Sequence, residues 1–133
     1  MQYLNKQLHT IESLVQQIDK GVLVMPNCVE WDVVKQSRAI ENILFGFPVP
    51  SIFLLENTRE VLPINSSIQF VKTIVNFVDD KFVLTNTTDG LLNLKFNNLP
   101  LKKKRQFNKT IIECVVMLDT TISIDTLDKM CFN

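Results

Sequence analysis

The sequence predicts a single α+β domain in which helices surround a small mixed β-sheet. Three observations support this class. Apolar residues recur at helical spacing in several segments, short β-rich runs lie between those segments, and residues 1–133 contain no repeat, linker or low-complexity tract. A chain of 133 residues is close to the commonest size of one domain, and a mixed order of helices and strands is typical of α+β proteins.

Two helices and a strand are expected in the first third of the chain. Residues 10–20 carry apolar side chains on one helical face, and Gly21 is a typical helix stop. Residues 22–25 are a short apolar run that predicts a buried strand. Residues 31–46 form the second expected helix, with Asp32 as a candidate N-terminal cap.

A β-hairpin followed by a helix is expected in the middle of the chain. Residues 51–55 and 60–64 favour strands, and the polar residues between them favour a turn. Pro63 has no backbone donor, which restricts the second strand to a sheet edge or makes Pro63 its end. Residues 66–79 repeat apolar positions at helical spacing and predict the third helix.

The last third is expected to add a basic helix and a long strand. Residues 82–84 favour a short strand, and residues 101–108 favour a helix rich in lysine. The β-branched and apolar residues of 109–118 predict a strand. Residues 124–132 predict a short final helix.

Composition excludes several classes of protein. The 14 basic residues balance the 14 acidic ones, which argues against a chain dominated by nonspecific nucleic-acid binding. No apolar run is long enough to span a bilayer, and the N-terminus lacks the apolar core of a signal peptide. We therefore expect no membrane association and a cytoplasmic location, the alternative being a virion or host-intracellular one.

Cysteine and histidine usage predicts no metal and no cofactor. Cys28, Cys114 and Cys131 are odd in number and widely spaced, so neither a disulfide framework nor a zinc site is expected. A reducing compartment is the simplest interpretation. His9 is the only histidine. Cys114 lies within an apolar strand and is expected to be a buried, unreactive thiol.

Two features remain as candidate contact sites. Trp31 begins the second expected helix, and we expect its side chain to be largely buried, the alternative being an anchor for a partner. The strongest charge feature is a basic cluster made of Lys102, Lys103, Lys104, Arg105 and Lys109. We interpret this cluster as a solvated helical face, the alternative being contact with nucleic-acid phosphates or with an acidic protein.

Segments spread over most of the chain resemble one protein family. Residues 31–54 contain a tryptophan, then K-Q-S at 35–37, then G-F-P-V-P at 46–50 before an expected strand. Residues 77–82 and 94–100 are similar to two further segments of the same pattern. In order and spacing these segments resemble the N-terminal domain of the GmrSD-type restriction endonucleases, which belongs to the ParB/sulfiredoxin-like superfamily. The resemblance implies a ParB/sulfiredoxin-like fold.

The charged signature of that family is replaced in this chain. In the family, I-D-G-Q-Q-R between the third strand and the following helix serves nucleotide binding and hydrolysis. The matching region here contains the degenerate motif Asn65, Ser66, Ser67 and Gln69, and the acidic residue, the glycine and the arginine are missing. Phosphate chemistry needs fixed charge and close backbone approach. The resemblance therefore implies a domain that is not an enzyme.

The sequence predicts a noncatalytic interaction or structural module derived from a restriction-type ParB-like domain. It would act through a protein partner in a viral or mobile-element assembly. The residues that build the fold are kept in this chain, whereas the polar residues of the site are replaced. This combination is typical of a fold that is retained for its surface. One alternative is a nucleic-acid-binding domain that uses the basic cluster, and the other is a residual nucleotidase.

Overall fold

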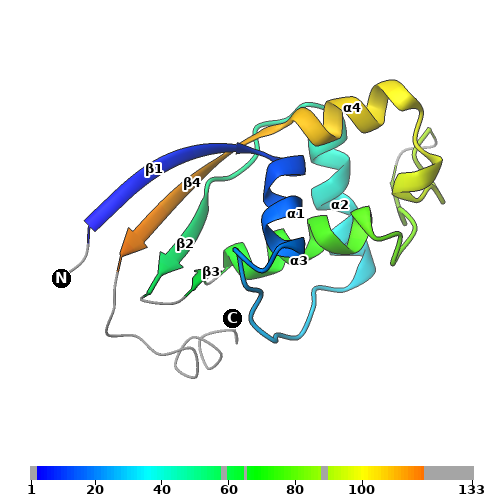
Figure 1. Ribbon diagram of the computed structural model, residues 1–133. Helices are drawn as coiled ribbons and strands as arrows, with labels where there is room; N and C mark the ends of the chain where they lie inside the picture. Colours follow the sequence, from blue (N-terminus) through cyan, green and yellow to red (C-terminus); the bar gives the residue numbers. More distant parts are fainter. Residues whose placement is uncertain (1–2, 58–59, 65, 88–89, 119–133) are drawn as a thin grey trace.

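The computed structural model describes residues 3–57, 60–64, 66–87 and 90–118 and confirms the α+β class. A mixed four-stranded sheet has the strand order β1-β4-β2-β3, and the helices gather on one side of it (Figure 1). The elements in chain order are β1 (Tyr3–Thr10), α1 (Ile11–Asp19), α2 (Val33–Leu44), β2 (Ile52–Glu56), β3 (Val61–Pro63), α3 (Ser66–Val78), the 3-10 helix η1 (Phe96–Asn98), α4 (Leu101–Lys109) and β4 (Ile111–Leu118).

The inner strand β4 joins the two halves of the sheet. It pairs antiparallel with β1, from Tyr3 opposite Leu118 to Thr10 opposite Ile111, and it pairs in parallel with β2. The predicted hairpin is confirmed, because β2 and β3 pair antiparallel. Pro63 ends β3, which lies at the edge of the sheet, as the missing backbone donor requires.

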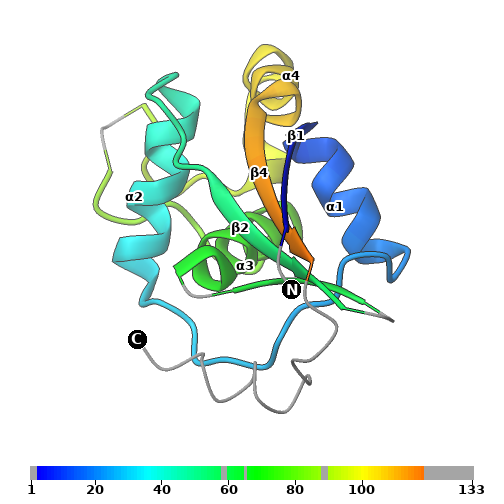
Figure 2. The ribbon, with the colours of Figure 1, turned by 90° about the vertical axis from the view of Figure 1, so that its left-hand side faces the viewer.

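The core lies between the helices and the sheet face that they cover (Figure 2). Each described α-helix and the strands β2 and β4 contribute to it, through side chains that include Ile11, Leu14, Ile40, Leu44, Ile52, Leu54, Ile74, Phe77, Phe107, Ile112 and Cys114. At one end of this core, the ring of Phe77 packs against Phe82, Phe96 and Phe107 at centroid distances of 5.7, 5.8 and 5.6 Å. This aromatic cluster ties α3 to α4 and to the chain between them.

Helix ends follow the signals in the sequence. The Thr10 hydroxyl accepts a hydrogen bond from the Ser13 N–H at 3.1 Å, and the Asp32 carboxylate accepts one from the Lys35 N–H at 2.9 Å. Gly46 takes a φ of 76° just beyond α2, a conformation that favours glycine. The helices predicted over 10–20, 31–46, 66–79 and 101–108 and the strands predicted over 51–55, 60–64 and 109–118 are confirmed, with ends shifted by at most two residues.

The edge strand β1 has no counterpart among the predicted elements. Its side chains from Asn5 to Leu8 are exposed on both faces, Leu8 at 69%, so no alternation of apolar and polar residues marks it. The strand forms because its backbone pairs with β4 along its whole length. A strand held mainly by backbone pairing leaves little trace in the side-chain pattern.

The short strands predicted over 22–25 and 82–84 are wrong. Leu23 forms only an isolated β-bridge, and its side chain is buried in the core. Leu84 is also fully buried but belongs to no strand. Both runs are apolar because they contribute side chains to the core from a loop. An apolar run alone does not distinguish such a loop from a short strand. The helix predicted over 124–132 lies outside the described residues.

The thiol of Cys114 lies on the core face of β4. It has no exposed surface, so the prediction that it is buried is confirmed. Burial, together with the negative charge of neighbouring Glu113, raises the pKa of the thiol from 9.0 to about 11. The thiol is therefore protonated as well as inaccessible over the physiological range.

We expect iodoacetamide to leave Cys114 unmodified in the folded protein at about pH 8, and to alkylate it once guanidinium unfolds the chain. Peptide mass spectrometry measures the alkylation of Cys114 in the folded and in the unfolded protein. Because the folded state raises the pKa of this thiol, its contribution to stability is present below 9.0 and is lost as the pH rises toward 11. Equal alkylation rates in the folded and unfolded protein would contradict the burial.

Candidate functional site

The described positions of the degenerate motif lie at the start of α3. Ser67 is 4% exposed, and its hydroxyl accepts a hydrogen bond from the Phe53 N–H of β2 at 2.8 Å. Ser66 is exposed at the first position of α3, and Asn65 lies outside the described residues. The Ser67 hydroxyl therefore joins α3 to β2 and is not presented to a ligand.

The side chain of Gln69 fixes the loop that precedes α2. Its Oε1 accepts a hydrogen bond from the Trp31 N–H at 3.0 Å, and its Nε2 donates one to the Val29 carbonyl. Both polar groups of the amide are thereby used within the fold. The position of Trp31 is set by a residue 38 positions away in the sequence.

Two further side chains of α3 hold the same loop. Lys72 Nζ donates to the Cys28 carbonyl at 3.0 Å. Asn76 Nδ2 donates to the Glu30 carboxylate at 2.8 Å and to the Gln36 side-chain carbonyl at 3.2 Å. These bonds, with those of Gln69, form a polar network that joins α3, the loop and the start of α2. Cys28 is also disulfide-bonded, which corrects the expectation that the cysteines form no disulfide.

The polar network is directed inward rather than toward a ligand. Ser67, Gln69 and Asn76 are neutral, and the ammonium of Lys72 is bonded to a backbone carbonyl. Within the described ranges, no group of three or more histidine, cysteine, aspartate or glutamate side chains is arranged to hold a metal ion. Where the resemblance implies a nucleotide-binding signature, the side chains of this protein hold a loop in place.

Trp31 is half-buried: most of its side chain is covered, as predicted, and the rest remains accessible to solvent. The ammonium of Lys35 lies 4.4 Å from the centroid of the indole ring. The polar network fixes the position of Trp31. The N–H of Trp31 donates to Gln69, and its carbonyl accepts from Gln36 at 2.7 Å. With both backbone groups fixed in this way, the indole lies at the surface between α2 and α3.

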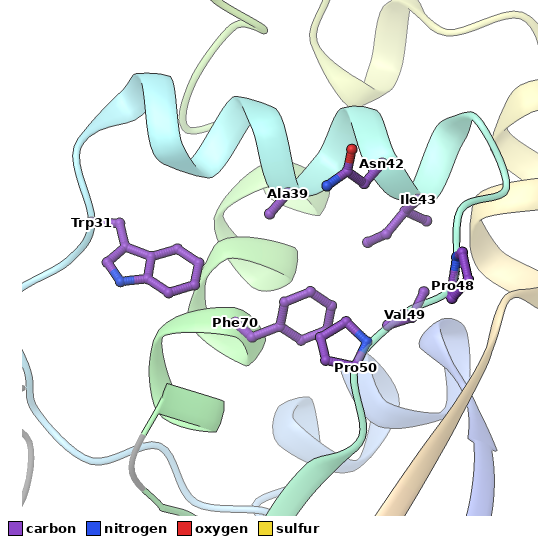
Figure 3. A pocket seen from close by; sticks show the side chains of 8 residues that line it. All are labelled: Trp31, Ala39, Asn42, Ile43, Pro48, Val49, Pro50 and Phe70. Carbon is purple, nitrogen blue, oxygen red and sulfur yellow. The ribbon is translucent and has the colours of Figure 1, made fainter.

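A cavity of about 180 Å³ opens beside Trp31 (Figure 3). Figure 3 shows the six-membered ring of Trp31 pointing toward Phe70, whose ring lies beside Pro50. Asn42 supplies the polar side chain of an otherwise apolar lining. We call this cavity the Trp31 groove, which is lined by Trp31, Ala39, Asn42, Ile43, Pro48, Val49, Pro50 and Phe70.

Replacing Trp31 with alanine should lower the free energy of unfolding by about 2–3 kcal/mol, because part of the ring's apolar area is already in contact with water. This is less than the cost of about 3–5 kcal/mol that truncation of a core aromatic carries. Urea denaturation followed by circular dichroism measures the difference. A loss as large as that of a core aromatic would show that the indole is part of the core.

The cations of the basic cluster fall into two groups on α4: some contact other parts of the fold, and the others are exposed. Lys103 Nζ donates to the Leu44 carbonyl at the end of α2 at 3.1 Å. Lys104 Nζ lies 5.8 Å from the centroid of the Phe96 ring. The remaining cations are exposed and share one face of α4 at spacings of three and four residues. We call these the basic stripe, which consists of Lys102, Arg105 and Lys109.

The Trp31 groove is the feature that sequence reasoning missed. Pro48 and Pro50 are interpreted from the sequence only as helix breakers, and Phe70 lies in a segment interpreted only as an apolar helix. A signal did exist in the same segment. Phe45 and Phe47 flank a glycine immediately before the two prolines, and both remain exposed, at 46% and 57%. Aromatic residues gathered in a segment that cannot continue a helix favour a contact surface.

Comparisons with protein-family models, with curated proteins and with solved structures find no match. The resemblance to the restriction endonuclease domain therefore stays a prediction from the sequence. Among the described residues, no helix is both long and apolar enough to cross a membrane.

Proposed function

We propose that this chain is a noncatalytic protein-interaction module that binds its partner at the Trp31 groove. Its fold would be a ParB/sulfiredoxin-like domain of the restriction type, retained for its surface in a viral or mobile-element assembly. The observation that carries the proposal is the half-buried Trp31, part of which is accessible at an open, apolar cavity. Partly exposed tryptophan is enriched among the residues that dominate the energy of protein interfaces.

The size and chemistry of the groove support a protein partner over a small molecule. Pockets for cofactors and drug-sized ligands usually measure roughly 300–1,000 Å³, whereas this cavity measures about 180 Å³. Its lining contains no titratable side chain. Phe45 and Phe47, with ring centroids 6.1 Å apart, extend the apolar surface at the end of α2. Apolar surface gathered in one place is typical of an interaction site.

A peptide-display selection tests this proposal directly. A random library is selected on the wild-type protein, and each enriched sequence is then measured on Trp31→Ala and on Phe53→Ala. Phe53 is a matched control because it is 43% exposed and lies outside the groove. We expect enriched peptides that lose at least about tenfold in affinity on Trp31→Ala and bind Phe53→Ala like the wild type. Selection that yields no Trp31-dependent ligand would overturn the proposal.

The proposal also predicts that nucleotides do not bind. The degenerate motif supplies no cation or acidic group to a phosphate, because the described members are neutral and Ser67 and Gln69 are bonded within the fold. Calorimetry with ATP and GTP, with and without magnesium, should show no binding tighter than about 1 mM, roughly −4 kcal/mol. Micromolar affinity for either nucleotide would favour the residual nucleotidase instead.

One observation favours nucleic-acid binding as a second candidate function. The three cations of the basic stripe are exposed on one face of α4, although the chain has no net charge. The triple variant Lys102→Gln, Arg105→Gln, Lys109→Gln is compared with a control in which Lys6, Lys20 and Lys81, all exposed elsewhere, become glutamine. If the stripe contacts phosphates, the first variant alone should weaken binding to duplex DNA and reduce its salt dependence. Equal binding by both variants would remove this candidate.

A further inference from the structure

The dimensions of the Trp31 groove select an extended segment over a helix. A helix docked in a groove places anchors at i, i+3 or i+4 and i+7, which spreads them over roughly 10 Å. A single cavity of about 180 Å³ has no room for such a row. An extended segment needs to insert only one or two side chains at a time.

The lining of the groove suits proline. Trp31 and Phe70 provide two aromatic rings, and Pro48 and Pro50 hold the opposite wall in a rigid, extended course. Grooves lined with aromatic rings bind polyproline II segments, which lose little conformational entropy on binding. Asn42 offers a donor and an acceptor to the backbone of such a segment.

Two hydrogen-bonding groups at the groove are unused within the described part of the chain. The indole N–H of Trp31 has no hydrogen-bond partner there, and neither has the side-chain amide of exposed Asn42. A polyproline II segment leaves its carbonyl groups free to accept hydrogen bonds. The indole N–H and the Asn42 amide are therefore suited to the backbone of a proline-containing ligand.

Two exposed cations lie beside the groove. Lys35 is exposed with its ammonium above the Trp31 ring, and Arg38 is exposed one helical turn further along α2. Both acidic residues next to Trp31 are engaged within the fold: the carboxylate of Asp32 caps α2, and that of Glu30 accepts a hydrogen bond from Asn76. A ligand with an acidic side chain next to its proline would pair with Lys35 at the edge of the indole.

We propose that the Trp31 groove binds an extended, proline-containing segment of a partner protein that carries an acidic residue beside the proline. The proline ring packs against the accessible part of the Trp31 indole, and the carboxylate pairs with Lys35. This inference rests on the proposed function, because it names the partner chemistry of the same groove.

Tryptophan fluorescence reports this binding, because Trp31 is the only tryptophan of the chain. The probes are blocked peptides made of Pro-Pro-Glu repeats, Pro-Pro-Lys repeats and Gly-Gly-Glu repeats. We expect the Pro-Pro-Glu peptide to change the emission saturably at low salt and to bind at least about tenfold more tightly than either of the others. On Lys35→Glu the preference between the glutamate and lysine peptides should reverse. Lys35 is exposed in the first turn of α2, where glutamate is favourable, so this variant should fold.

The outcomes separate the inference from the proposed function. Absence of binding by the Pro-Pro-Glu peptide, equal affinity for all three peptides or an unchanged preference on Lys35→Glu would each overturn the inference. Display ligands that depend on Trp31 but contain neither proline nor an acidic residue would overturn it too, while leaving the proposed function intact. Failure to find any Trp31-dependent ligand would overturn both.

Discussion

Replacing Phe77 with alanine is expected to lower the free energy of unfolding by about 3–5 kcal/mol, the range for large aromatic truncations in cores. The side chain has no exposed surface, and its ring contacts three other phenylalanine rings. Removing it opens a cavity at the point where α3, α4 and η1 meet. The melting temperature should fall by roughly 10 °C or more, which differential scanning calorimetry measures.

Phe47→Ala is the matched control for this prediction. Phe47 is 57% exposed and contacts only the ring of Phe45 among the aromatic residues described. Its truncation should cost less than about 1 kcal/mol, because little apolar area is returned to water. Similar losses for Phe77→Ala and Phe47→Ala would contradict the assignment of the aromatic cluster to the core.

The helices could be predicted because each carries its signals locally. Apolar residues recur at helical spacing, Asp32 caps α2, and Gly46 takes the left-handed conformation that ends it. The strand β1 lacks such signals, since its side chains from Asn5 to Leu8 are exposed and its stability comes from the backbone of β4. Local sequence patterns indicate which side chains are buried, but they indicate backbone pairing with a distant strand only weakly.

The candidate site depends on contacts that no local pattern contains. Trp31 precedes an amphipathic helix, and its neighbours alone predict burial but not the groove beside it. Its position is set by Gln69, which the sequence places only as a remnant of the degenerate motif. Gln69, Lys72 and Asn76 share one face of α3 at spacings of three and four residues. That polar face within an apolar helix is the signal from which the network could have been predicted.

Replacing Asn76 with leucine should cost about 1–3 kcal/mol, although leucine fills a similar volume. Asn76 is 5% exposed, and its amide donates to both Glu30 and Gln36. Leucine supplies no donor, so the carbonyl of Gln36, a side chain that is 7% exposed, is left without this hydrogen bond. Urea denaturation measures the loss. Gln16→Leu, which changes an exposed amide on α1, is the control and should lie within about 0.5 kcal/mol of the wild type.

A double-mutant cycle with Gln36→Leu identifies the cause of that loss. If the cost arises from an unsatisfied buried carbonyl, removing both polar partners should cost less than the sum of the two single changes, with a coupling of about 0.5–3 kcal/mol. Gln36 also donates to the Trp31 carbonyl, so every variant that breaks the network should shift the fluorescence of Trp31. Additive losses with unchanged emission would mean that α3 does not hold the loop. The groove would then lose the support that holds its indole in place.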